Sequence, residues 1–244
     1  MENTLLCTGR GTGPRGGDGP GEPLVGTGGW DYLNHEGDRL REYSRLFDFT
    51  EVNTTFYHVP MLSAARSWRR RVPPGFTFAV KCNRRATHEL GLRPEEETFQ
   101  VLEAMRAVMR ALRSRMLVLQ TPPSFPLDED RVPEVGALLS GAGLGDAQVL
   151  WGTRIPLSRG RLQSVRSKML SVGITPVVDL GKEPPVEGSS VTYSRLFAPT
   201  RLTYEELKLI DSRLRLSGSE VLVLSFHGAA MYRDAHRFKE VTRP

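Results

Sequence analysis

From residue 24 onward, short apolar segments of strand type alternate with segments of helix type, and this alternation limits the folds open to the chain. It is typical of a parallel sheet with crossover helices. At 244 residues the chain has the size of one α/β barrel, and it lacks the glycine-rich phosphate loop of an open doubly wound sheet. Segment 181–190 has loop composition where the sixth helix is expected. The sequence therefore predicts a single (β/α)8 TIM barrel over residues 24–244, with a degenerate sixth crossover. The expected strands cover residues 24–28, 49–55, 76–82, 116–120, 148–152, 175–180, 191–196 and 220–226.

Residues 1–23 differ in composition from the rest of the chain. They are rich in glycine and proline and have almost no apolar residue after Leu6, so we expect a disordered tail. No apolar run approaches the ~18 residues of a membrane helix, and the first residues lack the apolar core of a secretory signal. These features predict a cytoplasmic protein with no membrane partner.

Cysteine content and charge exclude several classes of function. Cys7 and Cys82 are too few for a disulfide framework or a four-thiolate metal site. The net charge of +5 is spread along the chain, without a basic block that contains interleaved aromatic residues. Such a distribution is typical of a solvated surface, so nucleic-acid binding is possible but not favoured.

Polar residues gather at the C-terminal ends of the expected strands, where barrel enzymes hold their active sites. Because side chains alternate along a strand, one face of each strand end points into the barrel. This alternation predicts three catalytic candidates, Glu51, Lys81 and Asp179. The candidates for substrate binding are Trp30, Asn53, Tyr57, His88, Gln120, Arg195 and His227.

Several chemistries fit these residues. Lys81 could act as a Schiff-base nucleophile or a general acid, or could bind a phosphate or carboxylate together with Arg195. Alternatively, Glu51 and Lys81 neutralise each other and fill the barrel. Four oxygen and imidazole groups, on Glu51, His88, Asp179 and His227, suit a divalent metal, but no compact His-x-His or His-Glu-x-x-His spacing is present. We predict no metal ligand, and the residues indicate no particular cofactor.

The motifs in these strand ends resemble those of one family, the YecE-like proteins, a domain of unknown function numbered 72. Family members open with a strand similar to Gly-Thr-Ser-Gly-Trp and continue with segments similar to Val-Glu-Ile-Asn-Ser-Thr-Phe-Tyr and Phe-Ser-Val-Lys. The matching segments here are 26–30, 51–57, 78–81, 87–88, 119–125, 193–196 and 231–238. The resemblance covers nearly everything after residue 23, and it implies a TIM barrel whose activity is not established.

Three strand ends depart from the family pattern. In the family the fifth strand usually resembles Glu-Phe-Arg. Here residues 150–154 are Leu-Trp-Gly-Thr-Arg, and Arg154 can partly replace the missing arginine. The seventh usually continues Arg-Leu-His-Gly but has Phe197 and Ala198 at the last two positions. The eighth usually ends Phe-Asn-Asn, and here His227 and Gly228 follow the phenylalanine. The resemblance therefore implies a site whose activity is weakened, changed or lost.

Taken together, we expect an enzyme of hydrolase or lyase type that acts on a small phosphorylated or carboxylated compound at the barrel mouth. One alternative is a metal-dependent, nucleic-acid-processing barrel, which rests on analogy of fold. The other is a non-catalytic ligand-binding protein that has lost family site residues. The sequence defines neither the substrate nor the oligomeric state.

Overall fold

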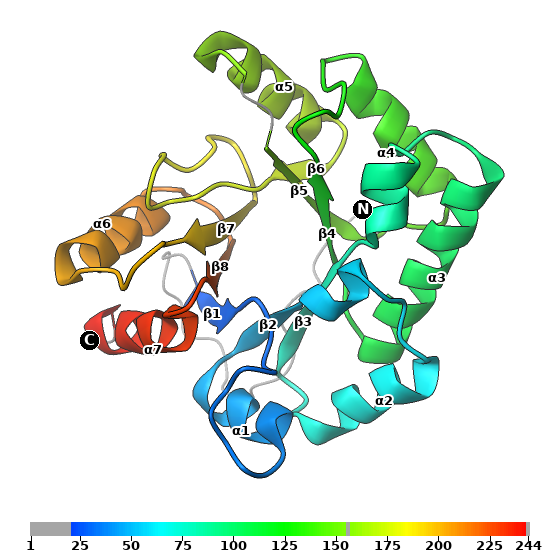
Figure 1. The fold of residues 1–244 in the computed structure, drawn as a ribbon. Coiled ribbons are helices and arrows are strands. Elements are labelled where there is room, and N and C mark those ends of the chain that lie inside the picture. Colours follow the sequence, from blue (N-terminus) through cyan, green and yellow to red (C-terminus); the bar gives the residue numbers. More distant parts are fainter. Residues whose placement is uncertain (1–20, 155–156, 243–244) are drawn as a thin grey trace, which may run out of the picture.

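The computed structural model describes residues 21–154 and 157–242. The tail predicted for residues 1–23 lies, up to residue 20, outside the described residues. From Leu24 to Thr242 the described chain forms the strands and helices of one barrel (Figure 1).

Within the described residues, eight strands form one parallel sheet in the order β6-β5-β4-β3-β2-β1-β8-β7. A parallel bridge between Val178 and Ser194 joins the two edges beyond β6 and nearly closes the barrel. The predicted α/β barrel is therefore confirmed. The strands are β1 (Leu24–Thr27), β2 (Phe49–Val52), β3 (Thr77–Lys81), β4 (Met116–Thr121), β5 (Gln148–Thr153), β6 (Ile174–Pro176), β7 (Val191–Phe197) and β8 (Val221–His227).

Helices form an outer ring around this sheet (Figure 1). The segment between β6 and β7, which the structure describes in full, has no helix, so the degenerate sixth crossover is confirmed. The α-helices are α1 (Arg39–Leu46), α2 (Leu62–Arg71), α3 (Glu96–Leu112), α4 (Arg131–Gly141), α5 (Arg159–Ser171), α6 (Tyr204–Arg215) and α7 (Met231–Thr242). Two short turns, the 3-10 helix η1 (Asn53–Phe56) and the π-helical η2 (Arg85–Glu89), follow β2 and β3.

Local sequence signals explain where individual helices begin and end. At α6 the Thr203 hydroxyl accepts a hydrogen bond from the backbone of Glu206, whose carboxylate accepts one from the Thr203 backbone. This reciprocal pair satisfies two free donors of the first turn. Helix α3 ends at Arg113, which takes a left-handed backbone conformation with φ 54°. Its buried face includes Leu102, Met105 and Leu112.

The second strand is shorter than predicted, because polar side chains bond to the backbone after Val52. The Thr55 hydroxyl donates to the carbonyls of Val52 and Lys81, with both distances 2.6 Å. The Asn53 amide donates to the carbonyl of Gly28 at 2.8 Å. Side-chain bonds of this kind compete with the sheet ladder and favour a turn. Residues 53–56 therefore leave the strand and form η1 at the barrel mouth.

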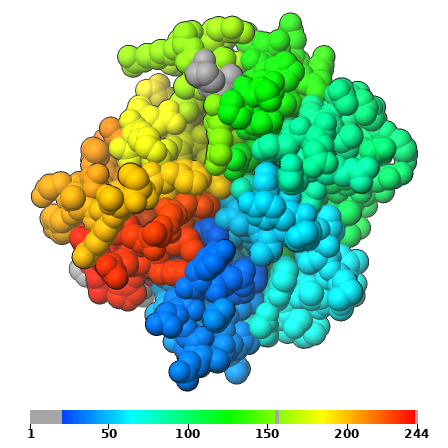
Figure 2. All heavy atoms as spheres, viewed as in Figure 1, coloured from blue at the N-terminus to red at the C-terminus, as the bar shows by residue number. Residues whose placement is uncertain are grey.

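The molecule has two apolar cores. The larger one lies between the sheet and the outer helices, and it includes the free and buried Cys82. The smaller one fills the barrel below its mouth. Its buried members are Phe49, Ala79, Met116, Val118, Leu150, Val191, Tyr193 and Val223. Atoms fill the middle of the face seen in Figure 2, so the barrel is a packed core rather than a pore.

Across the described ranges, no helix combines the length and the apolar character that a bilayer crossing requires. The cytoplasmic location stays a prediction from the sequence.

Candidate functional site at the barrel mouth

A polar layer lies directly above the apolar filling of the barrel, at the C-terminal strand ends. All of its members except His227 follow an inward apolar residue by two positions on the same strand, and His227 follows Ser225 in the same way, which places them on the same face. Nearly all of these side chains are buried. We call this set the mouth layer: Glu51 on β2, Lys81 on β3, Gln120 on β4, Arg195 on β7, and Ser225 and His227 on β8.

Glu51 is the centre of the mouth layer and is 0% exposed. It accepts a hydrogen bond from the Tyr193 hydroxyl at 2.9 Å. Its Oε1 lies 3.0 Å from Nη2 of Arg195, and its Oε2 lies 3.6 Å from Nε2 of His227. Burial alone would raise the pKa of Glu51, but Arg195 and His227 outweigh it and hold that pKa well below its usual value. The carboxylate is thus ionised and bound from three sides.

Arg195 links three strands through its guanidinium group. Besides the ion pair with Glu51, its Nη1 donates to Oε1 of Gln120 at 2.8 Å, and its Nε donates to Nε2 of His227 at 3.4 Å. The partner of Glu51 is therefore Arg195 on β7, across the barrel, and not Lys81 on the neighbouring strand as one sequence interpretation had it. A buried charge pair with further hydrogen bonds fixes the geometry of its members.

Lys81 is the mouth-layer cation that has no such partner. It is 9% exposed, and its Nζ lies 4.3 Å from the centre of the Phe56 ring. Among the described residues, its ammonium group makes no hydrogen bond and no ion pair within 4.0 Å. Burial, followed by the charge of Arg195, lowers the pKa of Lys81 to about 8, and Glu51 only partly opposes this.

His227 lies between the ion pair and the outer surface. Its Nε2 shares a hydrogen bond of 3.0 Å with the hydroxyl of Ser225, and its ring stacks on Phe197 with 4.6 Å between centroids. Burial lowers the pKa of His227, which Glu51 partly opposes. Gly28, directly after the neighbouring strand β1, approaches this ring so closely that a Cβ atom would collide with His227 and Asn53. This close approach explains the glycine at that position.

Phe197 covers the mouth layer from outside. It is 41% exposed, and its ring centroid lies 5.0 Å from the guanidinium carbon of Arg195 and 6.0 Å from that of Arg154. Sequence reasoning named this residue only as a departure from the family pattern and not as a site candidate, although it follows Arg195 by two positions on the same strand face. The alternation that identified Arg195 also points to Phe197, and only its apolar character set it apart from the other candidates.

The remaining predicted residues divide into two groups. His88 stays beside Lys81: its ring meets the Phe56 ring at 5.1 Å, its Nδ1 lies 2.9 Å from the Thr87 hydroxyl, and its pKa is lowered by burial and then by Arg84 and Lys81. Asn53 and Gln120 also lie at the mouth, through the bonds given above.

Three predicted residues lie outside the mouth layer. Asp179 binds Lys182 at 2.6 Å and accepts from the Gly181 backbone at 3.1 Å, so it holds the turn after β6, and it also accepts from the Phe197 backbone at 3.4 Å beside the mouth. Trp30 is 6% exposed and belongs to the core between sheet and helices. Tyr57 is exposed and contacts Phe56 edge to face.

The four residues weighed as metal ligands are not grouped together. Glu51 and His227 are neighbours, but His88 and Asp179 have the separate contacts described above. Among the described residues, no three His, Cys, Asp or Glu side chains form a group that could hold a metal ion.

Comparison with solved structures places this barrel among similar ones. A DUF72 family protein from Enterococcus faecalis V583 has a TM-score of 0.69 at 12% identity, over 89% of this chain and 96% of that one. A DUF72 family protein from Thermotoga maritima MSB8 has a TM-score of 0.64 at 18% identity, over 89% and 97% of the two chains. A xylose isomerase-like TIM barrel/4-hydroxyphenylpyruvate dioxygenase fusion protein reaches 0.53 at 12% identity, over 83% of this chain and 39% of that one.

These identities are low, so the structural likeness shows a shared fold and no shared activity. No curated protein matches the chain. The family model described as "Protein of unknown function DUF72" matches residues 24–145, which is half of the chain and includes Glu51, Lys81 and His88. The chain therefore belongs to the DUF72 family, as the motifs in its strand ends indicated.

Proposed function

We propose that the barrel mouth belongs to an enzyme that acts on a small phosphorylated or carboxylated compound. The observation that carries this proposal is the buried ammonium group of Lys81, which has no hydrogen-bond or ion-pair partner among the described residues. Leaving a buried cation unpaired is costly unless a ligand supplies the missing negative charge.

The charge balance at the mouth supports an anionic ligand. Arg195 occupies the only carboxylate of the mouth layer, Glu51, and this leaves the charge of Lys81 uncompensated. Arg154 adds a second cation, because it is exposed beside Phe197 and makes no ion pair within the described part of the chain. An anion between Lys81 and Arg154 would bind two cations at once.

The residues divide into a reactive part and a fixed frame. With a pKa of about 8, Lys81 has both its protonated and its neutral form available near neutral pH, which suits a group that donates or accepts a proton. Glu51, Arg195 and Gln120 hold each other in place, so in this proposal Glu51 positions Arg195 and does not transfer a proton. The proposal gives Asp179 no proton-transfer role, because its carboxylate binds Lys182 and accepts from the backbones of Gly181 and Phe197.

Thermal melts with inorganic phosphate test this assignment. A ligand that binds only the folded chain raises its melting temperature, so phosphate should stabilise the wild type. Lys81→Met should lose most of that shift, whereas Lys168→Met, at an exposed position on α5, should keep it. Equal shifts in all three proteins would contradict an anion site at Lys81.

A non-catalytic ligand-binding protein is the second candidate, and the stacking of Phe197 on His227 favours it. In this chain Phe197 occupies the position where the resemblance implies a histidine, and its apolar ring stacks on His227. A panel of phosphate monoesters and carboxylates separates the two candidates. Turnover that is lost in Lys81→Met supports the enzyme, whereas stabilisation by the same compounds without turnover supports the binding protein.

A further inference from the structure

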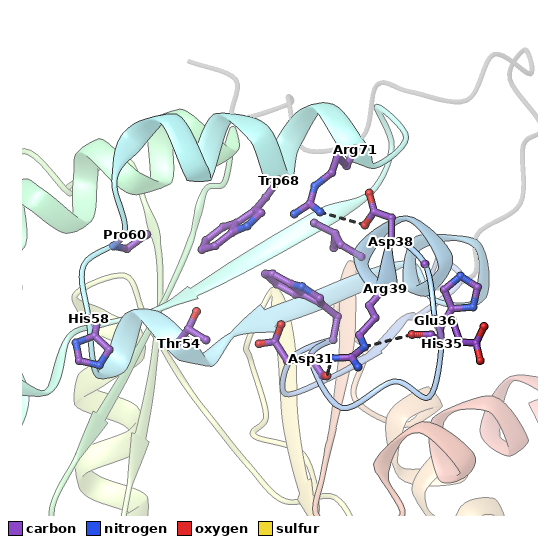
Figure 3. Close-up of a pocket in the computed structure, with 13 residues that line it drawn as sticks. Asp31, His35, Glu36, Asp38, Arg39, Thr54, His58, Pro60, Trp68 and Arg71 are labelled. Carbon is purple, nitrogen blue, oxygen red and sulfur yellow. Dashed lines mark hydrogen bonds and ion pairs between the residues drawn. The ribbon is translucent and has the colours of Figure 1, made fainter.

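A cavity of about 560 Å³ lies between the loop that follows β1 and the segment that runs from η1 into α2 (Figure 3). Ligand pockets usually measure about 300–1,000 Å³, so this cavity can hold a small molecule. None of the described residues that line it belongs to the mouth layer. It is therefore a site separate from the one proposed above.

The floor of this cavity is aromatic. Trp30, three residues after β1, and Trp68 on α2 meet edge to face, with 5.4 Å between ring centroids and 71° between their planes. Trp30 also packs on Phe78 at 6.4 Å, which backs the floor with the main core. Figure 3 shows the Trp68 ring reaching from α2 toward the cavity. Trp30 is 6% exposed and fixes Trp68, whose partly buried indole supplies the π surface of the cavity.

The two arginines of the walls are already bound to other wall groups. Nη1 of Arg71 lies 3.1 Å from a carboxylate oxygen of Asp38. Arg39 donates from Nη1 to the Asp31 carbonyl at 2.9 Å and from Nε to the His35 carbonyl at 3.4 Å. These bonds, drawn as dashed lines in Figure 3, brace the loop after β1.

Two carboxylates of the walls remain unpaired. The side chains of Asp31 and Glu36 line the cavity, and neither makes a hydrogen bond or an ion pair with another described residue. The lining residues include three acids and two arginines, and one acid is paired with one arginine. The cavity therefore carries a small negative charge in a chain whose net charge is +5.

We infer that this cavity binds a small organic cation that carries an alkylated ammonium group. The face of an indole attracts such a cation through its quadrupole, and tryptophan is the strongest of the aromatic side chains in this respect. Asp31 and Glu36 add a direct charge attraction from the walls. The alkyl groups of the ligand cover the indole surface, which an inorganic cation does not. The inference does not depend on the function of the barrel mouth.

Choline and its neutral isostere 3,3-dimethyl-1-butanol test the inference on the full chain. The two compounds share shape and hydroxyl group, and only choline is charged. Choline should change the tryptophan fluorescence and bind at least about tenfold more tightly than the isostere. Trp151, the third tryptophan, is buried on β5 with its own partners Thr121 and Phe125, so it supplies a constant background.

Variants locate the binding. The double variant Asp31→Asn/Glu36→Gln should weaken choline binding about tenfold, whereas the matched variant Asp146→Asn/Glu187→Gln, at exposed acids elsewhere, should bind like the wild type. Lack of choline binding, equal binding of the isostere, or unchanged binding in the first variant would each overturn the inference. Binding of inorganic phosphate that is lost in Arg39→Met would overturn it as well, because the arginines would then define an anion site.

Discussion

The barrel interior contains two layers that the same strands build from opposite chemistry. The lower layer is apolar and buried, while the mouth layer, two residues further along each strand, holds charged and polar groups that are almost equally buried. Backbone and strand pairing continue from one layer to the next. The pairs of lower and upper residues are Phe49 and Glu51, Ala79 and Lys81, Val118 and Gln120, Tyr193 and Arg195, and Val223 and Ser225.

This difference separates stability from function. Apolar residues of similar volume in the mouth layer would often leave the fold as stable or more stable, since buried ion pairs recover their desolvation cost only in part. The lower layer needs no partner beyond its own packing. The mouth layer, in contrast, is stable only while Glu51 and Arg195 remain paired, and it leaves Lys81 unpaired. We interpret the lower layer as the part that holds the barrel and the upper layer as the part that serves a ligand.

The largest expected effect follows from removing the charge of Glu51. Glu51→Gln leaves Arg195 buried without its counter-charge, so the free energy of unfolding should fall by about 3–5 kcal/mol. Urea denaturation measures this change. As a control, Glu240→Gln removes an exposed carboxylate on α7 and should change the free energy by less than ~0.5 kcal/mol.

A second variant sharpens this result. Adding Arg195→Met to Glu51→Gln removes the stranded cation, so the double variant should be more stable than the sum of the two single changes, by about 0.5–3 kcal/mol. A Glu51→Gln protein as stable as the wild type would mean that the mouth layer does not depend on its ion pair.

The next effect, opposite in sign, belongs to Lys81. Its pKa is about 8 in the folded chain, below the ordinary value of 10.5, so between these two pH values the unfolded chain binds more protons. The free energy of unfolding should therefore rise with pH across this window, and the full penalty should be present below pH 8. Since one pKa unit corresponds to 1.36 kcal/mol, the penalty amounts to at most about 3 kcal/mol.

Lys81→Met should remove both the penalty and this part of the pH dependence. Urea denaturation at several pH values from 7 to 10.5 compares the variant with the wild type, and Lys168→Met shows how the other titrating groups contribute. A pH profile of Lys81→Met that runs parallel to the wild type would indicate that Lys81 is as well solvated as an exposed lysine.

A smaller loss is expected when a polar group enters the lower layer. Val118→Thr places a hydroxyl group on β4 beside the β3 position of Lys81, among apolar neighbours. An unpaired buried hydroxyl costs about 1–3 kcal/mol. Val172→Thr, at a partly exposed position after α5, should change the free energy of unfolding by less than ~0.5 kcal/mol. If Val118→Thr and Val172→Thr change the free energy of unfolding equally, the lower layer tolerates polar groups as the mouth layer does.

Much of this arrangement could be predicted from the sequence, because both layers follow from the alternation of side chains along strands. That rule placed Glu51, Lys81, Gln120, Arg195 and His227 on the inward face, and the structure brings them together. The rule holds only while the chain remains a strand.

Where the strand ended early, the sequence was less informative. Thr55 and Asn53 bond to the backbone and turn the chain into η1, and beyond β6 Asp179 closes a turn with Lys182. The sequence also did not predict which charged side chains form ion pairs. Lys81 is on the strand next to Glu51, but Arg195 reaches Glu51 from across the barrel, and only the nearly closed ring of strands brings these two together.

The smallest effect on stability and the clearest effect on access should come from Phe197→Ala. The Phe197 ring is 41% exposed, so its loss should cost less than a core aromatic, for which about 3–5 kcal/mol is usual. The ring covers Arg195 and His227, and its removal should open the path to Lys81. Acetylation with an amine-reactive ester at pH 8, followed by peptide mass spectrometry, measures this path. About half of the Lys81 amine is unprotonated at that pH, so it can react, and it should react several-fold faster in Phe197→Ala than in the wild type.

Lys168 should react at the same rate in both proteins, and Tyr204→Ala, which removes an exposed aromatic ring on α6, should leave the Lys81 rate unchanged. An unchanged Lys81 rate in Phe197→Ala would show that the mouth layer is closed by more than this ring, and that both layers of the barrel are equally inaccessible to a ligand.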